Sequence, residues 1–230
     1  MNYQTILPAT FLRRPNRFVA HCLLDGKEVV CHVKNTGRCR ELLVPGYTVY
    51  LEYAPGPNRK TDYSLVAVDR DGLLINMDSY APNRVFYEYL ESRQSPLAPF
   101  RQYDSFRREV TFGDSRYDFA LTTGNQTSFG EIKGVTLEEN GVVRFPDAPT
   151  QRGVKHILGL CRAAEQGYGA HIVFVVQMEQ AKYMEPNDKT HPEFGQALRK
   201  AAACGVDLHA FCCQVTPSSL SIHHEIPIRL

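Results

Sequence analysis

One nearly continuous apolar segment constrains the fold of this chain more than any other feature. The segment is HIVFVVQM, residues 171–178, and it is apolar at nearly every position. A strand of this kind is covered on both faces, which is the situation of a central strand in a parallel sheet. The segment therefore predicts a three-layer α/β domain, with helices packed on both sides of a sheet.

The segments around this strand fit such a domain. Helical periodicity and end signals predict three helices, at 78–91, from about Thr150 to Gln166, and from Pro192 to Ala203. Strands are predicted between the first two helices. The segment VDLHAFCCQV, near the C-terminal end, is predicted to form a further strand of the same sheet. We expect this second domain to occupy residues 81–230.

The first third of the chain has a different pattern, in which short strands alternate with turns. A hairpin is predicted at 17–33, and three further strands at 46–53, 63–68 and 73–77. Five short strands at this spacing are typical of a small closed or partly open barrel. Residues 1–80 are therefore predicted to form a separate β-barrel domain.

Histidines and cysteines in the hairpin raise the question of a structural zinc site. The candidate ligands are His21, Cys22, Cys31, His32 and Cys39. The Asp-Gly turn at 25–26 fixes the register of the hairpin, so that the cysteines share the inner face while both histidines lie on the outer face. The same register places Phe18 on the inner face. The ligands do not converge, and the cysteines are interpreted as small core residues.

Composition limits the classes of function. The chain has 230 residues, a net charge of +1 and 43% hydrophobic residues, which suits a large core and does not suit a general polyanion-coating protein. Seven cysteines without a CxxC pair favour a reduced, cytoplasmic compartment. The N-terminal residues lack a secretory-signal pattern, and the chain has no apolar stretch of about 18 residues, so we expect no contact with a membrane.

Two acids and a lysine occur where a sheet would favour apolar residues. Glu131 and Lys133 are two apart on a predicted strand and therefore point to the same face. Asp118 lies on the preceding strand, and antiparallel pairing would bring it close to Glu131. Two adjacent carboxylates repel each other unless a cation lies between them, and Mg²⁺ (or Mn²⁺) with oxygen ligands satisfies both. The lysine could then orient water or balance charge on phosphorus, which suits phosphodiester cleavage.

Neighbouring segments supply further polar groups for such a site. The first turns of the helix after these strands carry Arg152, Lys155 and His156, and a helix N-terminus with added cations favours phosphate. Glu88 on the first helix is available as a further metal-shell or water-positioning acid, with a solvated helix face as the alternative. In the barrel, the outer face of the hairpin carries Arg17, which is compatible with nucleic acid or with an ordinary wet surface.

Several long motifs resemble one protein family almost from end to end. The motifs are LPATFLRRPNRFVA, KNTGRCREL, LVPG, APNR, GEIKGVTLEENG, FPDAPTQRGVKH, FVVQM and ACGVD. Together they are similar to the sugar fermentation stimulation protein A (SfsA) family. The resemblance implies an N-terminal OB-like β-barrel followed by a domain similar to the PD-(D/E)xK nuclease superfamily. It also implies a cytosolic DNA-binding protein whose family name refers to sugar (maltose) use.

The resemblance assigns roles to residues of this chain. It places the superfamily aspartate on Asp118, the Glu-x-Lys on Glu131 and Lys133, and the helical acid on Glu88. Tyr117 stands where a proline would precede the aspartate, which weakens the motif without removing a ligand. The family motif KNTGRCREL has donors suited to phosphate, with a buried structural turn as the equal alternative. These donors are Lys34, Asn35, Thr36, Arg38 and Arg40.

Three functional hypotheses remain at this stage. The first is a Mg²⁺-dependent endonuclease that acts on DNA or RNA, and the second is a non-catalytic DNA-binding regulator that keeps the nuclease fold. The third is a structural ion-pair cluster, which would be costly to bury without metal. The expected partner is nucleic acid, DNA in preference to RNA, and a second copy of the chain is a further candidate.

Overall fold

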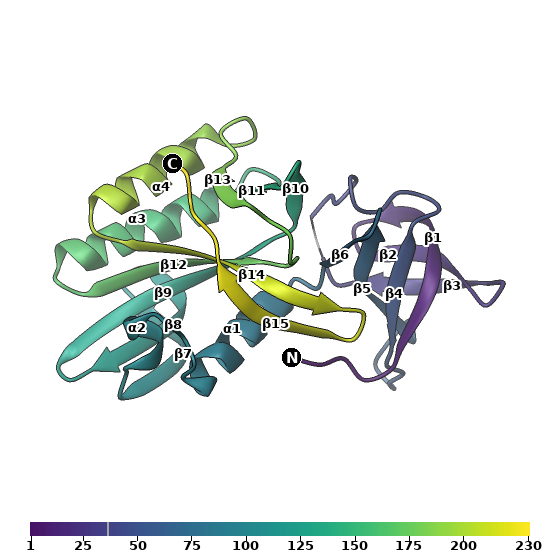
Figure 1. The fold of residues 1–230 in the computed structure, drawn as a ribbon, viewed down its shortest axis with the longest axis horizontal. Helices are drawn as coiled ribbons and strands as arrows, with labels where there is room; N and C mark the ends of the chain where they lie inside the picture. The colour runs from purple at the N-terminus through teal and green to yellow at the C-terminus, as the bar shows by residue number, and fades with distance from the viewer. Residues whose placement is uncertain (36) are drawn as a thin grey trace.

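The computed structural model describes residues 1–35 and 37–230, which fold into a barrel and a larger α/β domain (Figure 1). Six strands form the sheet of the N-terminal domain, in the order β3-β2-β1-β4-β5-β6. A parallel pairing of β3 with β5 closes five of them into a barrel. The strands are β1 (Ile6–Asn16), β2 (Val19–Leu24), β3 (Lys27–Val33), β4 (Thr48–Tyr53), β5 (Tyr63–Arg70) and β6 (Leu73–Asn76). The predicted small barrel is confirmed.

The predicted hairpin register is also confirmed, with one correction. Cys22 pairs with Val29 and Ala20 pairs with Cys31, and both cysteines are fully buried. Phe18, however, is 50% exposed and is not part of the core. It lies in the turn between β1 and β2, where Asn16 Oδ1 accepts the Phe18 N–H at 2.9 Å, so strand alternation does not extend to it.

The second domain is built on a mixed six-stranded sheet, in the order β15-β14-β12-β9-β8-β7. The strand β12 (Gly169–Val176) is parallel to both β9 and β14, as its apolar sequence predicts. The other strands are β7 (Ser105–Phe112), β8 (Ser115–Thr123), β9 (Gln126–Val135), β14 (Asp207–Thr216) and β15 (Ser219–Glu225). A small additional sheet consists of β10 (Leu137–Glu139), β11 (Val142–Phe145) and β13 (Tyr183–Pro186).

Helices cover both faces of the large sheet, so the three-layer prediction is confirmed. The helices are α1 (Ala81–Ser92), α2 (Ala98–Arg101), α3 (Gln151–Glu165) and α4 (Pro192–Ala203). One core joins α1 and α2 to the sheet, and a second core joins α3 and α4 to its opposite face (Figure 1). None of the helices in the described residues is long and apolar enough to cross a membrane.

A buried polar network joins the two domains. The Gln177 side chain, directly after β12, donates to Asn76 Oδ1 at 2.9 Å and to the Asp78 carbonyl at 3.1 Å. Asn76 in turn donates to the Tyr3 hydroxyl at 2.9 Å, and Asp78 Oδ1 accepts the Tyr80 N–H at the start of α1. The barrel, the first helix and the central strand are therefore held in one arrangement.

We predict that Gln177→Met destabilises the protein by about 1–3 kcal/mol, because it removes two buried hydrogen bonds, one to Asn76 Oδ1 and one to the Asp78 carbonyl. Equilibrium urea denaturation measures this change. Gln214→Met, at an exposed position of β14, is the matched control and should change stability by less than about 0.5 kcal/mol. Equal effects of the two substitutions would show that the network does not stabilise the junction.

Candidate metal-dependent catalytic site

Asp118 and Glu131 meet where the pairing of β8 with β9 ends. The last backbone pair of this ladder joins Phe119 to Gly130, so Asp118 and Glu131 occupy the next opposed positions. At this point a side-chain oxygen replaces a backbone carbonyl as the hydrogen-bond acceptor, because Asp118 Oδ2 accepts the Ile132 N–H at 2.7 Å. The predicted proximity of the two carboxylates follows from this register.

Glu131 is buried and has two cationic or polar neighbours on one of its oxygens. Lys133 Nζ donates to Glu131 Oε1 at 2.5 Å, and His156 Nδ1 lies 2.6 Å from the same oxygen. The second oxygen, Oε2, is buried and has no hydrogen-bond partner among the described residues. A buried carboxylate oxygen without a partner is costly, and this atom keeps lone pairs that a ligand could use.

Helix α1 approaches the cluster through Asn83 and Tyr87. Asn83 Nδ2 donates to Asp118 Oδ1 at 2.8 Å, and the Tyr87 hydroxyl donates to the Asp118 carbonyl at 2.8 Å. Neither residue was predicted from the sequence. The structure does not bring Glu88 to this cluster, because its carboxylate binds the Met1 ammonium at 2.6 Å and Arg84 at 3.2 Å.

The electrostatics of the cluster favour the binding of a cation. Burial, together with the nearby charge of Glu131, raises the pKa of Asp118. The Ile132 N–H, Lys133 and Asn83 act in the opposite direction and do not cancel these effects. The charged form of Asp118 is therefore under-compensated, and a divalent ion would supply the missing charge.

The ligand atoms that this cluster offers fit a hard divalent ion such as Mg²⁺ or Mn²⁺. Asp118 and Glu131 offer carboxylate oxygens from adjacent strands, and the unpartnered Glu131 Oε2 has free lone pairs for coordination. Mg²⁺ characteristically takes one or two protein carboxylates, and water or phosphate completes its coordination.

The three polar residues predicted for the site from α3 do not all lie at the carboxylate cluster. His156 is buried against Glu131, and Arg152, an exposed residue one turn earlier on the same helix face, places its Nε 3.4 Å from His156 Nε2. Lys155 instead pairs with Asp114 at 3.3 Å. Of these three residues, Arg152 and His156 therefore face the carboxylate cluster and Lys155 does not.

The predicted donors of the KNTGRCREL motif also separate into two groups. Lys34 pairs with Glu52 at 2.9 Å and Asp78 at 3.3 Å, and Asn35 donates to the Met77 carbonyl, so both hold the domain junction. Thr36 lies outside the described residues. Arg38 and Arg40 are exposed and line a groove of 770 Å³ on the barrel.

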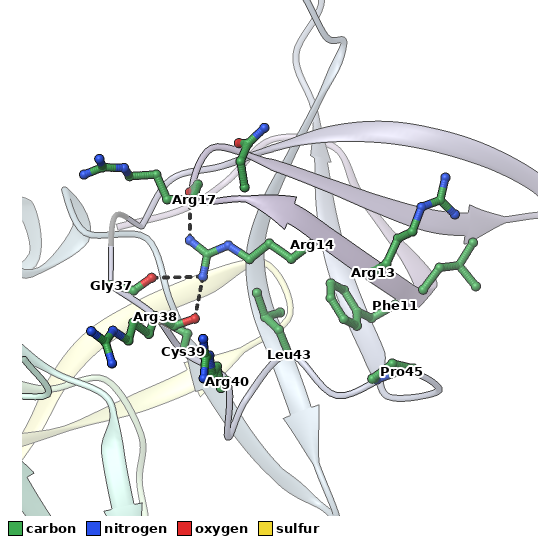
Figure 2. Close-up of a pocket in the computed structure, with 12 residues that line it drawn as sticks. Phe11, Arg13, Arg14, Arg17, Gly37, Arg38, Cys39, Arg40, Leu43 and Pro45 are labelled. Atoms are coloured by element: carbon green, nitrogen blue, oxygen red, sulfur yellow. Dashed lines mark hydrogen bonds between the residues drawn. The ribbon is translucent and has the colours of Figure 1, made fainter.

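Figure 2 shows how this groove is built around Arg14. The Arg14 guanidinium donates to four backbone carbonyls, which ties β1 to the loop after β3. The surrounding guanidinium groups form a basic groove that includes the predicted Arg17. The arginines that line it are Arg13, Arg14, Arg17, Arg38 and Arg40.

A second surface, which we call the aromatic pocket, combines exposed rings with positive charge. It is lined by Phe18 and Tyr80, 50% and 76% exposed, together with Arg59 and Lys60. Tyr80 also lines an adjoining depression with Asn83 and Tyr87, the two residues that hold Asp118. This pocket was not predicted from the sequence, because the exposure of Phe18 contradicts simple strand alternation.

Fold and site together define a two-domain protein, an OB barrel joined to a mixed α/β domain with an Asp/Glu-x-Lys cluster. Comparison with family models gives the same division. The "SfsA N-terminal OB domain" matches residues 12–77, and the "Sugar fermentation stimulation protein RE domain" matches residues 80–219. The chain belongs to the sugar fermentation stimulation protein (SfsA) family.

Individual relatives are similar over their whole length. The sugar fermentation stimulation protein homologs of Desulfitobacterium hafniense strain Y51 and Clostridium perfringens strain 13 are 49% and 47% identical. The alignments cover 100% of this chain in both cases, 99% of the first relative and 100% of the second. The structure of Pyrococcus furiosus SfsA in complex with Ca²⁺ is 27% identical with a TM-score of 0.88, and it covers 100% of this chain and 98% of that one.

We predict that Asp118→Asn stabilises the metal-free protein at neutral pH. The raised pKa of Asp118 means that its contribution to stability is present below the ordinary aspartate pKa of about 3.9 and is lost as the pH rises through the folded-state value. Asparagine avoids this loss, so its advantage should be larger at pH 7.5 than at pH 4.

Urea denaturation in chelator at the two pH values measures the difference between wild type and Asp118→Asn. Addition of Mn²⁺ should reverse the order of stability at pH 7.5, because only the wild type gains the carboxylate ligand. A variant that is less stable than wild type in chelator at pH 7.5 would contradict the electrostatic account of the cluster.

Proposed function

We propose that this protein is a divalent-metal-dependent nuclease, with nucleic acid held by the barrel and cleaved at the Asp118–Glu131–Lys133 cluster. One observation carries the proposal. The buried Glu131 Oε2 has no partner in the part of the chain that the structure describes, although the residue has a second carboxylate and a lysine as neighbours. A structural ion-pair cluster would satisfy that atom within the protein, whereas a metal site leaves it open.

Each residue has a definite task in this proposal. Asp118 and Glu131 would hold Mg²⁺ or Mn²⁺, which when bound polarises a phosphoryl oxygen and lowers the pKa of a coordinated water. Asn83 and the Ile132 N–H orient the Asp118 carboxylate. Lys133, 18% exposed, is placed to orient the attacking water or to balance negative charge on the phosphorus.

His156 and Arg152 support the cluster from α3. His156 fixes one oxygen of Glu131 and thereby directs the other into the site. Arg152 lies one helical turn before His156 on the solvent side, where it would meet a backbone phosphate next to the scissile bond.

A structural relative supports a cation site in the family, because the Pyrococcus furiosus SfsA protein is in complex with Ca²⁺. Ca²⁺ and Mg²⁺ both take oxygen ligands. The carboxylate pair offers ligands of this type in the present chain.

We propose DNA in preference to RNA as the substrate.

The substrate path is proposed to run from the barrel to the cluster through Tyr80. The aromatic pocket provides rings for base stacking and cations for the backbone, which is the combination found in proteins that bind single strands. The adjoining depression is lined by Asn83 and Tyr87, and both of these residues hydrogen-bond Asp118.

We predict that Lys133→Met reduces the rate of metal-dependent cleavage by about 100-fold or more. The assay uses labelled single- and double-stranded DNA and RNA with Mg²⁺, Mn²⁺ or chelator. Lys200→Met, on the exposed side of α4 and remote from the cluster, is the matched control and should cleave as the wild type does.

The same assay separates the alternatives. Tight binding without cleavage in every condition would favour the non-catalytic regulator that keeps the fold. If neither binding nor cleavage occurs at low salt, where phosphate-driven affinity is strongest, both proposals fail.

We predict that Tyr80→Ala weakens the binding of single-stranded DNA by about 1–3 kcal/mol, because one stacking partner is lost. Fluorescence anisotropy in chelator measures binding without cleavage. Tyr53→Ala, at an exposed tyrosine of β4 outside the pocket, is the control for a general loss of barrel stability. Equal affinities of Tyr80→Ala and wild type would exclude the proposed path.

A further inference from the structure

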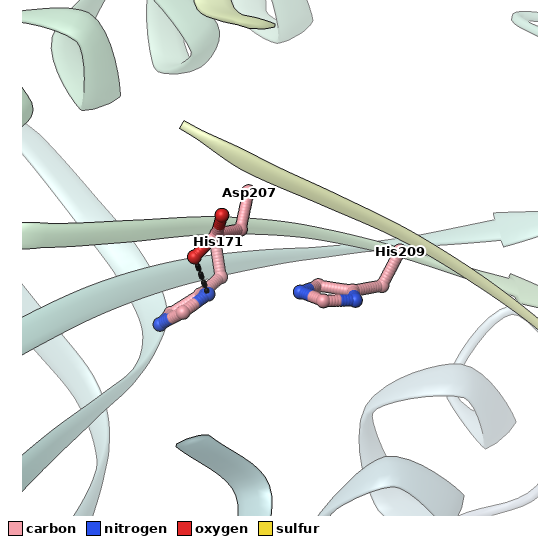
Figure 3. Close-up of side chains that lie close together, drawn as sticks. All are labelled: His171, Asp207 and His209. Atoms are coloured by element: carbon pink, nitrogen blue, oxygen red, sulfur yellow. Dashed lines mark ion pairs between the residues drawn. The ribbon is translucent and has the colours of Figure 1, made fainter. Parts of the chain in front are cut away.

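A buried histidine, a half-buried histidine and an exposed aspartate converge on the face of the sheet opposite the carboxylate cluster. His171 on β12 is opposite Asp207 on β14 in the parallel register, and His209 is two residues further along β14. All three side chains therefore project from the same face, and each offers a ligand atom within 4.8 Å of the others (Figure 3).

Both histidines have a ring nitrogen that lacks a hydrogen-bond partner within residues 1–35 and 37–230. These atoms are His171 Nδ1 and His209 Nε2, both buried, and the His171 side chain is only 5% exposed. His171 Nδ1 lies 3.5 Å from Asp207 Oδ2, beyond good hydrogen-bond distance. Two buried nitrogens without partners would be a net cost to stability if the cluster had only a packing role.

The charged groups around the two rings are both acidic. Around the pair, Phe100 packs on both rings and Glu225 and Asp207 are the charged groups that face them.

Glu225 fixes the orientation of the second histidine. Its Oε1 lies 3.0 Å from His209 Nδ1, so this nitrogen carries the proton and Nε2 is left as the free lone pair. A carboxylate that binds the far nitrogen of a histidine is the usual support of a metal-binding imidazole. Glu225 comes from β15, so three adjacent strands build the arrangement.

We propose that His171, His209 and Asp207 form a binding site for a transition-metal ion, with Zn²⁺ as the expected occupant. Two imidazoles and one carboxylate are a common zinc ligand set, and water can complete a tetrahedral arrangement. Asp207 is 63% exposed, so the ion can enter from solvent. Nitrogen ligands select against Mg²⁺ and Ca²⁺, and the site is therefore distinct in chemistry from the carboxylate cluster.

The test measures Zn²⁺ binding to the full chain by calorimetric titration after dialysis against chelator. An Asp118→Asn background removes a carboxylate of the first cluster, so that Zn²⁺ bound there does not confuse the stoichiometry. We expect one equivalent of Zn²⁺ per chain, no competition from millimolar Mg²⁺, and loss of binding in His209→Gln.

Two exposed carboxylates keep the test independent of folding. Asp207→Asn should weaken Zn²⁺ affinity by at least about 10-fold, and Glu225→Gln by about 10–100-fold, since loss of a supporting carboxylate has effects of this size. His223→Gln, an exposed histidine on β15 outside the cluster, is the control and should bind as the background does.

Two results would overturn the proposal. One is the absence of stoichiometric Zn²⁺ binding in the background protein. The other is binding that is equally strong in Asp207→Asn, Glu225→Gln and the His223→Gln control, which would identify adventitious binding elsewhere on the surface.

Discussion

The hydrogen bond from the Ile132 N–H to the Asp118 carboxylate determines how the rest of the site is arranged. It lies where the ladder between β8 and β9 ends, and it fixes the Asp118 carboxylate beside Glu131. Burial and the nearby charge of Glu131 both disfavour the charged form of Asp118 and raise its pKa. The surrounding donors of the described chain compensate only in part, which leaves the Glu131 Oε2 atom buried and unpartnered.

The junction between the domains determines how the binding surfaces of the barrel are placed relative to this cluster. The buried network around Gln177 fixes the first turn of α1 against the barrel, so that Tyr80 is placed between the aromatic pocket and the Asp118 site. The basic groove around Arg14 lies on the same domain. In the proposed function a polyanion follows these surfaces to the carboxylate cluster, so the proposal requires both domains.

Local sequence patterns were sufficient to predict much of this structure. They failed for contacts that depend on how distant elements pack against each other. The apolar run of β12 and the Asp-Gly hairpin define their own environments, and the two-residue period places Glu131 and Lys133 on one face. Which face of α1 meets Asp118 depends on how the helix crosses the sheet, so Asn83 was not predicted. Lys34 and Asn35 have the donors of a phosphate site but hold the domain junction, a distinction that requires the positions of Glu52 and Met77. The His171–His209 pair comes from strands separated by a helix, which no local motif reveals.

A crystal structure of the full chain with Mn²⁺, combined with anomalous scattering, tests the central claim most directly. We predict an anomalous peak between the Asp118 and Glu131 carboxylates, with Glu131 Oε2 among the ligands and Lys133 beside the ion. The contradicting result is the absence of such a peak at saturating Mn²⁺, with Glu131 still bound only through Oε1 to Lys133 and His156. In that case the three residues would be an ion-pair cluster, and the cleavage chemistry proposed for them would have no basis.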